Sequence, residues 1–430
     1  MADIEYLKSL QAVRDRANLV LKAAEQGQLT HFHYHADKMP AVADYVAGII
    51  TRDFGPDRYD KIPPHGRWQH FNVGQVPRVE NLTKQWKDSG CNNLEITRRL
   101  VDLFFVSVLL DAGAGEVWSY TEPGTENKYV RSEGIAVAAL YMLNASAFSS
   151  KADAPERVDG QGLVNLDVST FRKHFQSTPD NTILGDSSRV SLLNRVGSSL
   201  LNLPKIFGKE GRPGQLVDYM LESRKESGSL DFDVLWSVLQ TLLLPSWPKD
   251  RTHVAGVPIG DSWPLEVLAR ANTTQKTENG TANIQPFHKL TQWLAYSVTI
   301  PFIRILGLEW KNLERATALP EYRNGGIFID LDVLVLKDET LKEGLKASKE
   351  KLPSFGASSD PIVEWRSLTV SLSDVLLKLL NARFANQNVK LTLPQMLEAG
   401  TWKGGRELAA KLRPETKSSP ILIEGDGTLF

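Results

Sequence analysis

The stretch IEYLKSLQAVRDRANLVLKAAE, residues 4–25, decides the fold class of this chain. Its apolar residues recur near the spacing of an α-helix, while charged residues fill the opposite face. The pattern predicts an amphipathic helix with one buried side. The apolar positions are Ile4, Leu7, Leu10, Val13, Leu19 and Leu21.

The same periodicity recurs along most of the chain. Strand-like runs are short, at 30–35, 115–121 and 326–334, and they do not alternate with helices, which argues against a doubly wound sheet. We predict a mainly α, large multi-helix single domain over residues 1–430, which can divide into two lobes of about 1–160 and 161–430 around a cleft. The polar stretch 270–286 is predicted to be an exposed loop. Further helices are predicted at 39–51, 93–111, 131–147, 186–203, 213–224, 230–243, 286–306, 309–317, 361–382, 394–399 and 405–412.

Composition excludes several classes of function. The formal net charge is −1, and Lys+Arg 50 balances Asp+Glu 51, so the chain lacks the basic excess of a nucleic-acid-binding protein. The single cysteine, Cys91, excludes an intrachain disulfide and a thiolate metal cluster and fits a reducing compartment. The N-terminal segment has no apolar signal-peptide core, and no apolar run reaches the roughly 18 residues of a membrane span. We expect a cytoplasmic protein with no nucleic-acid or membrane partner; the oligomeric state stays open.

Two apolar helices carry polar groups that need an explanation. In PFHKLTQWLAYSVTIPFIRIL, His288, Gln292, Tyr296 and Thr299 form one polar stripe, which must face a ligand, water or a satisfied buried network. In LVDLFFVSVLLDAGAGEVWSYTEPG, Asp111 ends the helix, where the helix macrodipole disfavours a carboxylate by about 0.3–1 kcal/mol.

The same segment continues into Trp118 and Tyr120, which would share one face of a strand. They are predicted either to stack on a planar ligand or to belong to the core.

Histidines and arginines follow in two loops. In IPPHGRWQHFNVG, His65, Arg67 and His70 could hold a phosphate or sugar, or belong to a structured turn. The residues His31, His33 and His35 alternate on one strand face and, with His65, are the candidate zinc ligands. No second ligand cluster supports a metal site, so we expect no cofactor and keep zinc as the alternative.

Two segments near the C-terminus complete the candidates. In AGTWKGGRELAAKLRP, Gly404 and Gly405 are predicted to open a helix whose free N–H groups, with Arg406, would suit an anion, although a glycine turn explains them equally well. In SSDPIVEWRSLTV, Asp360 is predicted as an N-cap with Glu364 in the first turn, and Arg366 would pair with a carboxylate.

Several motifs together resemble one known family. They are HGRWQHF (65–71), DAGAG (111–115) with Trp118 and Tyr120, GDSWP (260–264), FHKL (287–290) with QWL (292–294), LPEYRNGG (319–326), VEWRSLTV (363–370), GTW (400–402) with Gly405 and Arg406, and DGTLF (426–430). This set resembles the uracil-catabolism protein 4 family, also catalogued as domain of unknown function 1688. Gln75 and Asp332 stand where the family pattern has glycine, and Gln69 where it has a basic residue. Asp332 is therefore a poor catalytic candidate, whereas Asp330 remains one.

The resemblance implies a place in a uracil-degrading route in which the pyrimidine is ribosylated, its ring is opened and urea is released. The segments EYRNGG and VEWRSLTV are also similar to segments of the queuosine-salvage nucleotide N-glycosylase family. That shorter similarity implies a core like that of the helix-hairpin-helix DNA glycosylases, with Glu321 at the position of an active-site carboxylate.

These lines converge on hydrolysis of the N-glycosidic or C–N bond of a ring-opened uracil nucleotide, a ribosylurea-like phosphate. The hypothesis assigns catalysis to Glu321, with Asp111 or Asp330 as the second acid. The predicted substrate-binding residues are Arg323, Trp118, Tyr120, Arg67, His70, His288, Gln292, Asp261, Trp263, Glu364, Arg366 and Arg406. Two alternatives stay open: a metal-dependent amidohydrolase that uses the histidines, and a non-catalytic nucleotide-binding regulator.

Overall fold

The computed structural model describes residues 2–115, 117–151, 156–224, 228–248, 251–271, 280–348 and 351–425. Residues 272–279 of the predicted loop and the motif at 426–430 lie outside this part of the chain. The described residues form two compact units. Unit 1 takes those in Met1–His65, Lys249–Lys289 and Glu314–Gly425, and unit 2 those in Gly66–Pro248 and Leu290–Leu313. The predicted mainly α fold is confirmed, because the described strands are short and occur in two-stranded sheets.

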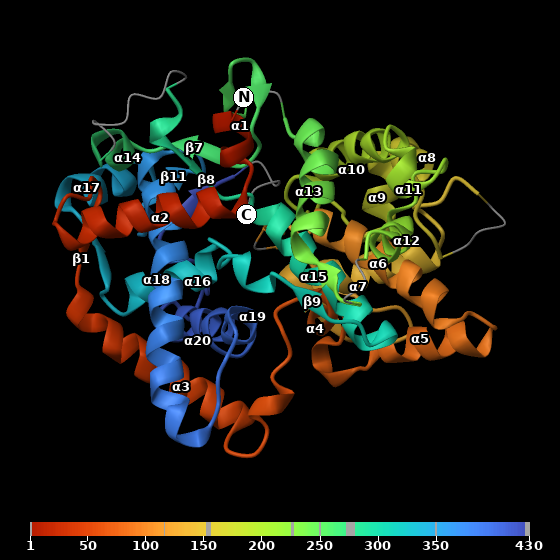
Figure 1. The fold of residues 1–430 in the computed structure, drawn as a ribbon, viewed down its shortest axis with the longest axis horizontal. Coiled ribbons are helices and arrows are strands. Elements are labelled where there is room, and N and C mark those ends of the chain that lie inside the picture. Colours follow the sequence, from red (N-terminus) through yellow and green to blue (C-terminus); the bar gives the residue numbers. More distant parts are fainter. Residues whose placement is uncertain are drawn as a thin grey trace. The chain divides into compact units, whose positions relative to one another are not determined.

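Unit 1 contains the N-terminal and C-terminal helices (Figure 1). Its helices are α1 (Ala2–Leu7), α2 (Leu10–Glu25), α3 (Met39–Phe54), α14 (Glu266–Ala271), α16 (Tyr322–Asp330), α17 (Asp338–Ala347), α18 (Asp360–Phe384), α19 (Leu393–Met396) and α20 (Trp402–Leu412), with a π-helical segment, η9 (Leu397–Thr401), between the last two. Its strand pairs are β1 (Phe32–Tyr34) with β10 (Leu334–Leu336), β5 (His253–Val254) with β6 (Val257–Pro258), β7 (Ser262–Pro264) with β8 (Ile284–Pro286), all antiparallel, and β11 (Ser354–Gly356) parallel with β12 (Leu422–Glu424).

Unit 2 is built mostly from the middle of the chain. Its helices are α4 (Arg67–Phe71), α5 (Arg78–Asp88), α6 (Asn93–Leu109), α7 (Arg131–Asn144), α8 (Gly160–Asn165), α9 (Val168–His174), α10 (Asp186–Leu201), α11 (Pro204–Phe207), α12 (Leu216–Glu222), α13 (Phe232–Leu243) and α15 (Lys289–Leu306). Its strand pairs are β2 (Ser119–Thr121) antiparallel with β3 (Lys128–Val130), and β4 (Leu230–Asp231) parallel with β9 (Trp310–Lys311).

The core of unit 1 surrounds α18, which packs against α2 and α3 (Figure 1). Every residue of α18 from 361 to 373 is buried, as expected for a helix covered on all sides. The helix begins one residue earlier than predicted: Ser359 is the N-cap and Asp360 is the first helical residue.

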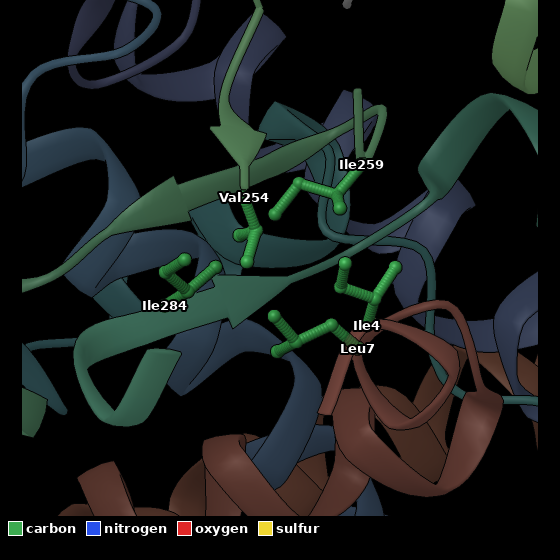
Figure 2. Close-up of a cluster of buried hydrophobic side chains, with 5 residues drawn as sticks. All are labelled: Ile4, Leu7, Val254, Ile259 and Ile284. Atoms are coloured by element: carbon green, nitrogen blue, oxygen red, sulfur yellow. The ribbon is translucent and has the colours of Figure 1, made fainter. Parts of the chain in front are cut away.

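The helix predicted over 4–25 is two helices, because the Ser9 side chain caps α2 by accepting the N–H of Ala12 at 3.1 Å. The short α1 packs its apolar side on strands from elsewhere in unit 1. Figure 2 shows this cluster of Ile4, Leu7, Val254, Ile259 and Ile284. All five side chains are buried, so they fasten the start of the chain to β5 and β8.

Two predicted elements are wrong. The range 309–317, predicted as a helix, holds β9 and a single 3-10 turn at Leu313–Arg315. The range 326–334, predicted as a strand, mostly belongs to α16 and its C-terminal end. Asn-Gly-Gly, at 324–326, lies within the first two turns of α16. A Cβ on Gly325 would lie 2.6 Å from Thr369 Oγ1 of α18, so the glycine permits close helix packing.

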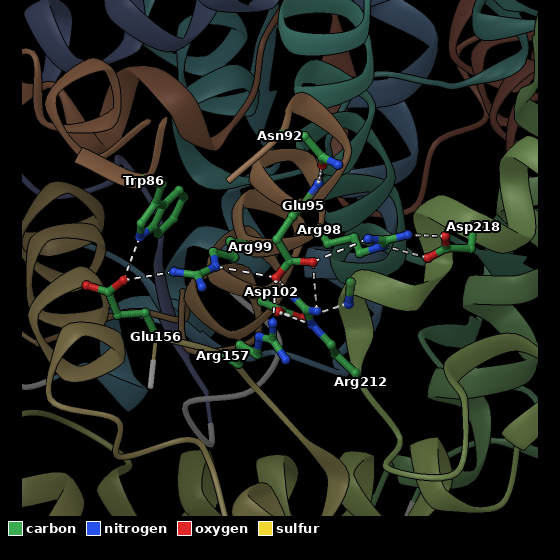
Figure 3. A network of polar contacts seen from close by, with 11 residues as sticks. Trp86, Asn92, Glu95, Arg98, Arg99, Asp102, Glu156, Arg157, Arg212 and Asp218 are labelled. Carbon is green, nitrogen blue, oxygen red and sulfur yellow. Dashed lines mark hydrogen bonds and ion pairs between the residues drawn. The ribbon is translucent and has the colours of Figure 1, made fainter. Parts of the chain in front are cut away.

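Ion pairs along α6 organise unit 2 (Figure 3). Glu95 accepts from Arg98, Arg99, Arg157 and Arg212, while Asp102 accepts from Arg212 Nε at 2.8 Å and from the Gly214 N–H at 2.6 Å. Burial raises the pKa of Asp102 to about 6, and Arg212, which it shares with Glu95, only partly opposes that shift. This network holds α6 in place, and α6 carries Asp111 just beyond its end.

Among the described helices, none combines the length and the apolarity that crossing a membrane requires.

Candidate functional site

The cluster around Asp111 lies in unit 2, at the C-terminal end of α6. Arg67 NH1 donates to Asp111 Oδ2 at 2.7 Å, and Trp293 Nε1 donates to the same oxygen at 3.2 Å. The Asp111 side chain is 8% exposed. The carboxylate therefore sits between a guanidinium and an indole in a largely dry environment, where charge interactions are strong.

Arg67 holds this arrangement together from α4. Its Nε donates to Ser107 Oγ at 2.8 Å and its NH2 to the Ser107 carbonyl at 3.1 Å, while NH1 also lies 3.4 Å from His70 Nδ1. The Arg67 side chain is fully buried, and burial lowers its pKa, whereas Asp111 and Glu133 raise it. His70 lies edge-on to Trp293, with ring centroids 5.5 Å apart.

Local packing explains why these groups meet. A Cβ on Gly66 would lie 2.2 Å from Ile300 Cδ1, so this glycine lets the start of α4 approach α15, the helix that carries Trp293. The C-terminal end of α6 is compensated by Arg189 of α10, which donates to the carbonyls of Leu110, Ala112 and Gly113. Burial lowers the pKa of Arg189 to about 10, and the nearby Asp111 opposes the shift.

Asp111, Arg67 and His70 were predicted from the sequence as site residues, but their partners Trp293, Ser107 and Arg189 were not. Trp293 was present within the QWL motif, beside the polar stripe. The only sequence signal for Arg189 is a charged residue within the apolar pattern of α10, which does not identify its partner.

Trp118 and Tyr120 are core residues of unit 2, 1% and 2% exposed. Trp118 Nε1 donates to the Phe175 carbonyl at 2.8 Å, and its ring stacks on Phe175. Burial raises the pKa of Tyr120 far above its ordinary value. Of the two interpretations of this pair, the arrangement favours core packing over ligand stacking.

The predicted polar stripe 288–299 is buried throughout. His288 lies before α15 with φ +50°, and its Nε2 donates to the Leu7 carbonyl at 2.8 Å. Burial lowers the pKa of this imidazole. Thr299 Oγ1 donates to the Tyr296 carbonyl at 2.8 Å, and Gln292 is fully buried. Hydrogen bonds within the protein thus explain why the polar side chains of His288 and Thr299 can be buried.

A second charged group, in unit 1, joins Asp261 and Arg366 by two hydrogen bonds of 2.8 Å. Asp261 also accepts from Trp263 Nε1 and from the Lys289 N–H, and Arg366 lies 3.9 Å above the Phe287 ring. Burial raises the pKa of Asp261, but Arg366 outweighs burial and holds it well below its ordinary range. The predicted carboxylate partner of Arg366 is therefore Asp261.

Glu321 is the N-cap of α16, and its carboxylate accepts the backbone N–H groups of Arg323 at 3.0 Å and Asn324 at 2.6 Å. Asp330, at the other end of α16, forms two hydrogen bonds with Arg413 and is 5% exposed. Both carboxylates thus have structural partners.

Near the start of α20, Trp402 lies under two arginines. The Cζ atoms of Arg323 and Arg406 are 4.7 Å and 4.9 Å from the indole centroid. The helix predicted to open at Gly404 begins earlier, because α19, η9 and α20 run on without a break. Gly404 and Gly405 therefore lie inside a helix, and the predicted anion site on free N–H groups is wrong.

The histidines predicted as zinc ligands lie in different surroundings. His65 Nδ1 pairs with Glu398 of η9 at 2.6 Å, whereas His33 and His35 are exposed. His31 Nε2 is 3.0 Å from Asp360 Oδ2, and its Nδ1 is 3.1 Å from Thr340 Oγ1. Across the described residues, the group suited to a metal ion is His31, Glu266 and Asp360, not the three alternating histidines.

Glu364 of α18 is fully buried beside His31. Its carboxylate accepts the N–H groups of Thr30 at 2.8 Å, His31 at 2.9 Å and Phe32 at 3.2 Å. Burial raises the pKa of Glu364, although these hydrogen bonds oppose the shift. The carboxylate therefore fastens the start of β1 to α18.

Comparisons with known proteins place these features in context. A family model described as "Protein of unknown function (DUF1688)" matches residues 6–430. The chain is 43% identical over 441 residues to "Uracil catabolism protein 4" of Lachancea kluyveri, covering 99% of each chain. It is 46% identical over 425 residues to "Protein urg3" of Schizosaccharomyces pombe, covering 99% of this chain and 98% of that protein.

Proposed function

We propose that this chain, which belongs to the DUF1688 family as its motifs predicted, is an enzyme of uracil catabolism. The observation that carries the proposal is the similarity to a protein named for uracil catabolism, which extends over 99% of both chains. Because the similarity covers 99% of this chain, it includes both units.

The reaction we propose is hydrolysis of the N-glycosidic or C–N bond of a ring-opened uracil nucleotide, a ribosylurea-like phosphate, towards urea. Breaking the glycosidic bond generates an oxocarbenium-like sugar and a poor leaving group. The site therefore needs a carboxylate near the anomeric carbon and a group that protonates the departing urea.

The Asp111 cluster supports this chemistry, because Asp111 and His70 both lie beside Arg67 and Trp293 in unit 2. We assign to Asp111 either stabilisation of the developing oxocarbenium-like cation or activation of the attacking water. We assign protonation of the departing urea to His70. Arg67 is fully buried and bonds Asp111 and Ser107, which supports a positioning role in place of the predicted phosphate contact. Glu321 remains the second candidate carboxylate, in unit 1.

The test is to incubate the full chain with the product of the ring-opening step and to follow urea and ribose 5-phosphate by mass spectrometry. Asp111→Asn keeps an oxygen for Arg67 and Trp293 but loses the charge, so we expect turnover to fall by about 10²-fold or more. Glu321→Gln keeps an acceptor for the helix N-terminus and should retain full turnover. Circular dichroism controls for folding.

Other results of this experiment would support a different site or a different activity. Loss of turnover in Glu321→Gln with retention in Asp111→Asn would move the chemistry to α16. Ammonia in place of urea and ribose 5-phosphate would favour the amidohydrolase alternative. Binding of the substrate without any product would favour the regulator.

A further inference from the structure

Three potential metal ligands converge in unit 1, at the starts of three elements. One ligand atom each from His31, Glu266 and Asp360 lies within 4.8 Å of the other two. His31 Nε2 and Asp360 Oδ2 are 3.0 Å apart, close to the edge of about 3.3 Å in a tetrahedral site with bonds of about 2.0 Å. Two of the three ligands are therefore already spaced for an ion.

The side chains of His31 and Asp360 are also held in orientation by contacts of their other polar atoms, which would not bind the ion. His31 Nδ1 lies 3.1 Å from Thr340 Oγ1, and Asp360 Oδ1 accepts the Glu266 N–H at 2.8 Å. Metal-binding histidines usually hold a polar partner on the second ring nitrogen, which fixes the tautomer and the ring orientation. Thr340 is buried and can act as that partner.

The charges around the group supply an independent argument. His31, Glu266 and Asp360 place two carboxylates in the group. Within the described residues, the arginine paired with any of the three is Arg270, which bonds Glu266 at 2.9 Å. A divalent cation would therefore offset negative charge that Arg270 balances only in part.

We propose that His31, Asp360 and Glu266 bind one divalent transition-metal ion of the Zn²⁺ class. One imidazole nitrogen with two carboxylate oxygens suits Zn²⁺ better than Ca²⁺ or Mg²⁺, which prefer oxygen ligands alone. With the ion bound, the His31 proton resides on Nδ1 and is donated to Thr340, and Nε2 binds the metal. Without the ion, Nε2–H donates to Asp360.

The bound ion would have a structural role, and this role does not depend on the proposed reaction. Its ligands precede β1, begin α14 and begin α18, so one ion would join three segments that are distant in the sequence. Side-chain exposures of 16% for His31, 28% for Asp360 and 57% for Glu266 leave the ion a path from solvent.

The test is zinc binding by the full chain, measured by competition with a chromophoric chelator and by elemental analysis after dialysis. We expect one Zn²⁺ per chain and a rise in Tm on adding zinc. His31→Gln should weaken binding at least tenfold and abolish the rise. His33→Gln, on the exposed neighbour in β1, is the matched control and should behave like the unsubstituted chain.

Glu266→Gln provides a second variant, because Glu266 is 57% exposed and its ion pair with Arg270 lies at the surface, where such pairs contribute little to stability. It should weaken zinc binding while the Tm of the metal-free chain stays the same. Wild-type affinity in both His31→Gln and Glu266→Gln, or no zinc bound by the unsubstituted chain at a roughly tenfold molar excess, would overturn the proposal.

Discussion

Gln75 and Asp332 occupy left-handed backbone positions, with φ +61° and +58°. Both are exposed, and both stand where the family resemblance led us to expect glycine. A side chain in this region costs about 1–2 kcal/mol, because Cβ crowds the following carbonyl oxygen. The sequence departure thus coincides with a measurable local strain.

Asp332→Gly should raise the free energy of unfolding by about 0.5–1 kcal/mol. The relief of strain exceeds the extra conformational entropy that glycine gives the unfolded chain. Urea denaturation measures the change. The matched control is Glu343→Gly, at an exposed position inside α17, which should lose about 1 kcal/mol. Destabilisation by Asp332→Gly would show that the side chain has a compensating contact.

Residue types at the candidate site were predictable from the sequence, but their partners were not. Asp111 needed compensation at a helix C-terminus, which sequence reasoning recognised from the macrodipole. Its partner Arg67 lies 44 residues earlier, and Asp330 pairs with Arg413 across 83 residues. Local periodicity carries no information about such long-range pairs, so only the fold identifies them.

Among the elements, strongly periodic helices were predicted well, and α3, α6, α10 and α13 lie within a few residues of their expected bounds. The error at 326–334 has a physical cause. Asn-Gly-Gly followed by Ile-Phe-Ile is typical of a turn and a strand. In α16 the glycines serve close packing instead, and contacts with neighbouring helices outweigh local propensity.

Gly405→Ala should destabilise the protein by about 1–3 kcal/mol or more. The new Cβ would lie 2.2 Å from the Arg323 carbonyl oxygen, so α20 and α16 must separate. Thermal or urea unfolding measures the loss. Gly48→Ala inside α3 is the matched control: its Cβ meets nothing within 4 Å, and we expect a gain of about 0.5–1 kcal/mol. Equal effects at the two sites would contradict the packing argument.

The network on α6 should make stability depend on pH through Asp102. Its folded pKa is about 6, above the roughly 3.9 of an unfolded aspartate, so the folded state binds the proton more tightly. The associated stability is full below about pH 4 and is lost as pH rises through 6. Relative to Asp102→Asn, the unsubstituted chain should lose up to about 3 kcal/mol over this window.

Urea denaturation of both proteins at intervals between pH 4 and 7 provides the measurement. Asparagine does not titrate, so the substituted chain supplies the baseline and any constant cost of the substitution cancels in the difference. A difference that is flat, or that grows in favour of the unsubstituted chain as pH rises, would rule out a raised pKa at Asp102.

At the scale of the whole molecule, each unit is assembled from segments that are far apart in the sequence. Within unit 2, α15 brings Trp293 to Asp111, and β9 pairs with β4. Helical periodicity predicts the individual elements but not this grouping, because apolar faces do not specify which face covers which.

Fragment 66–248 lacks α15 and β9, so we expect it to show no cooperative thermal transition by circular dichroism. The longer fragment 66–313 retains every described segment of unit 2 and should unfold in a sharper transition. Equally cooperative unfolding of the two fragments would mean that α15 is not needed to complete unit 2.

The contact of α18 with α2 and α3 has a consequence for biosynthesis. The first two of these helices to be made, α2 and α3, leave the ribosome long before α18 is translated. At about 5–20 residues per second, the roughly 305 residues between α3 and α18 impose a delay of roughly 15–60 s. Throughout that interval the faces of α2 and α3 that pack against α18 stay uncovered by it. The nascent chain should therefore depend on chaperones early, and the speed of translation should set the length of that dependence.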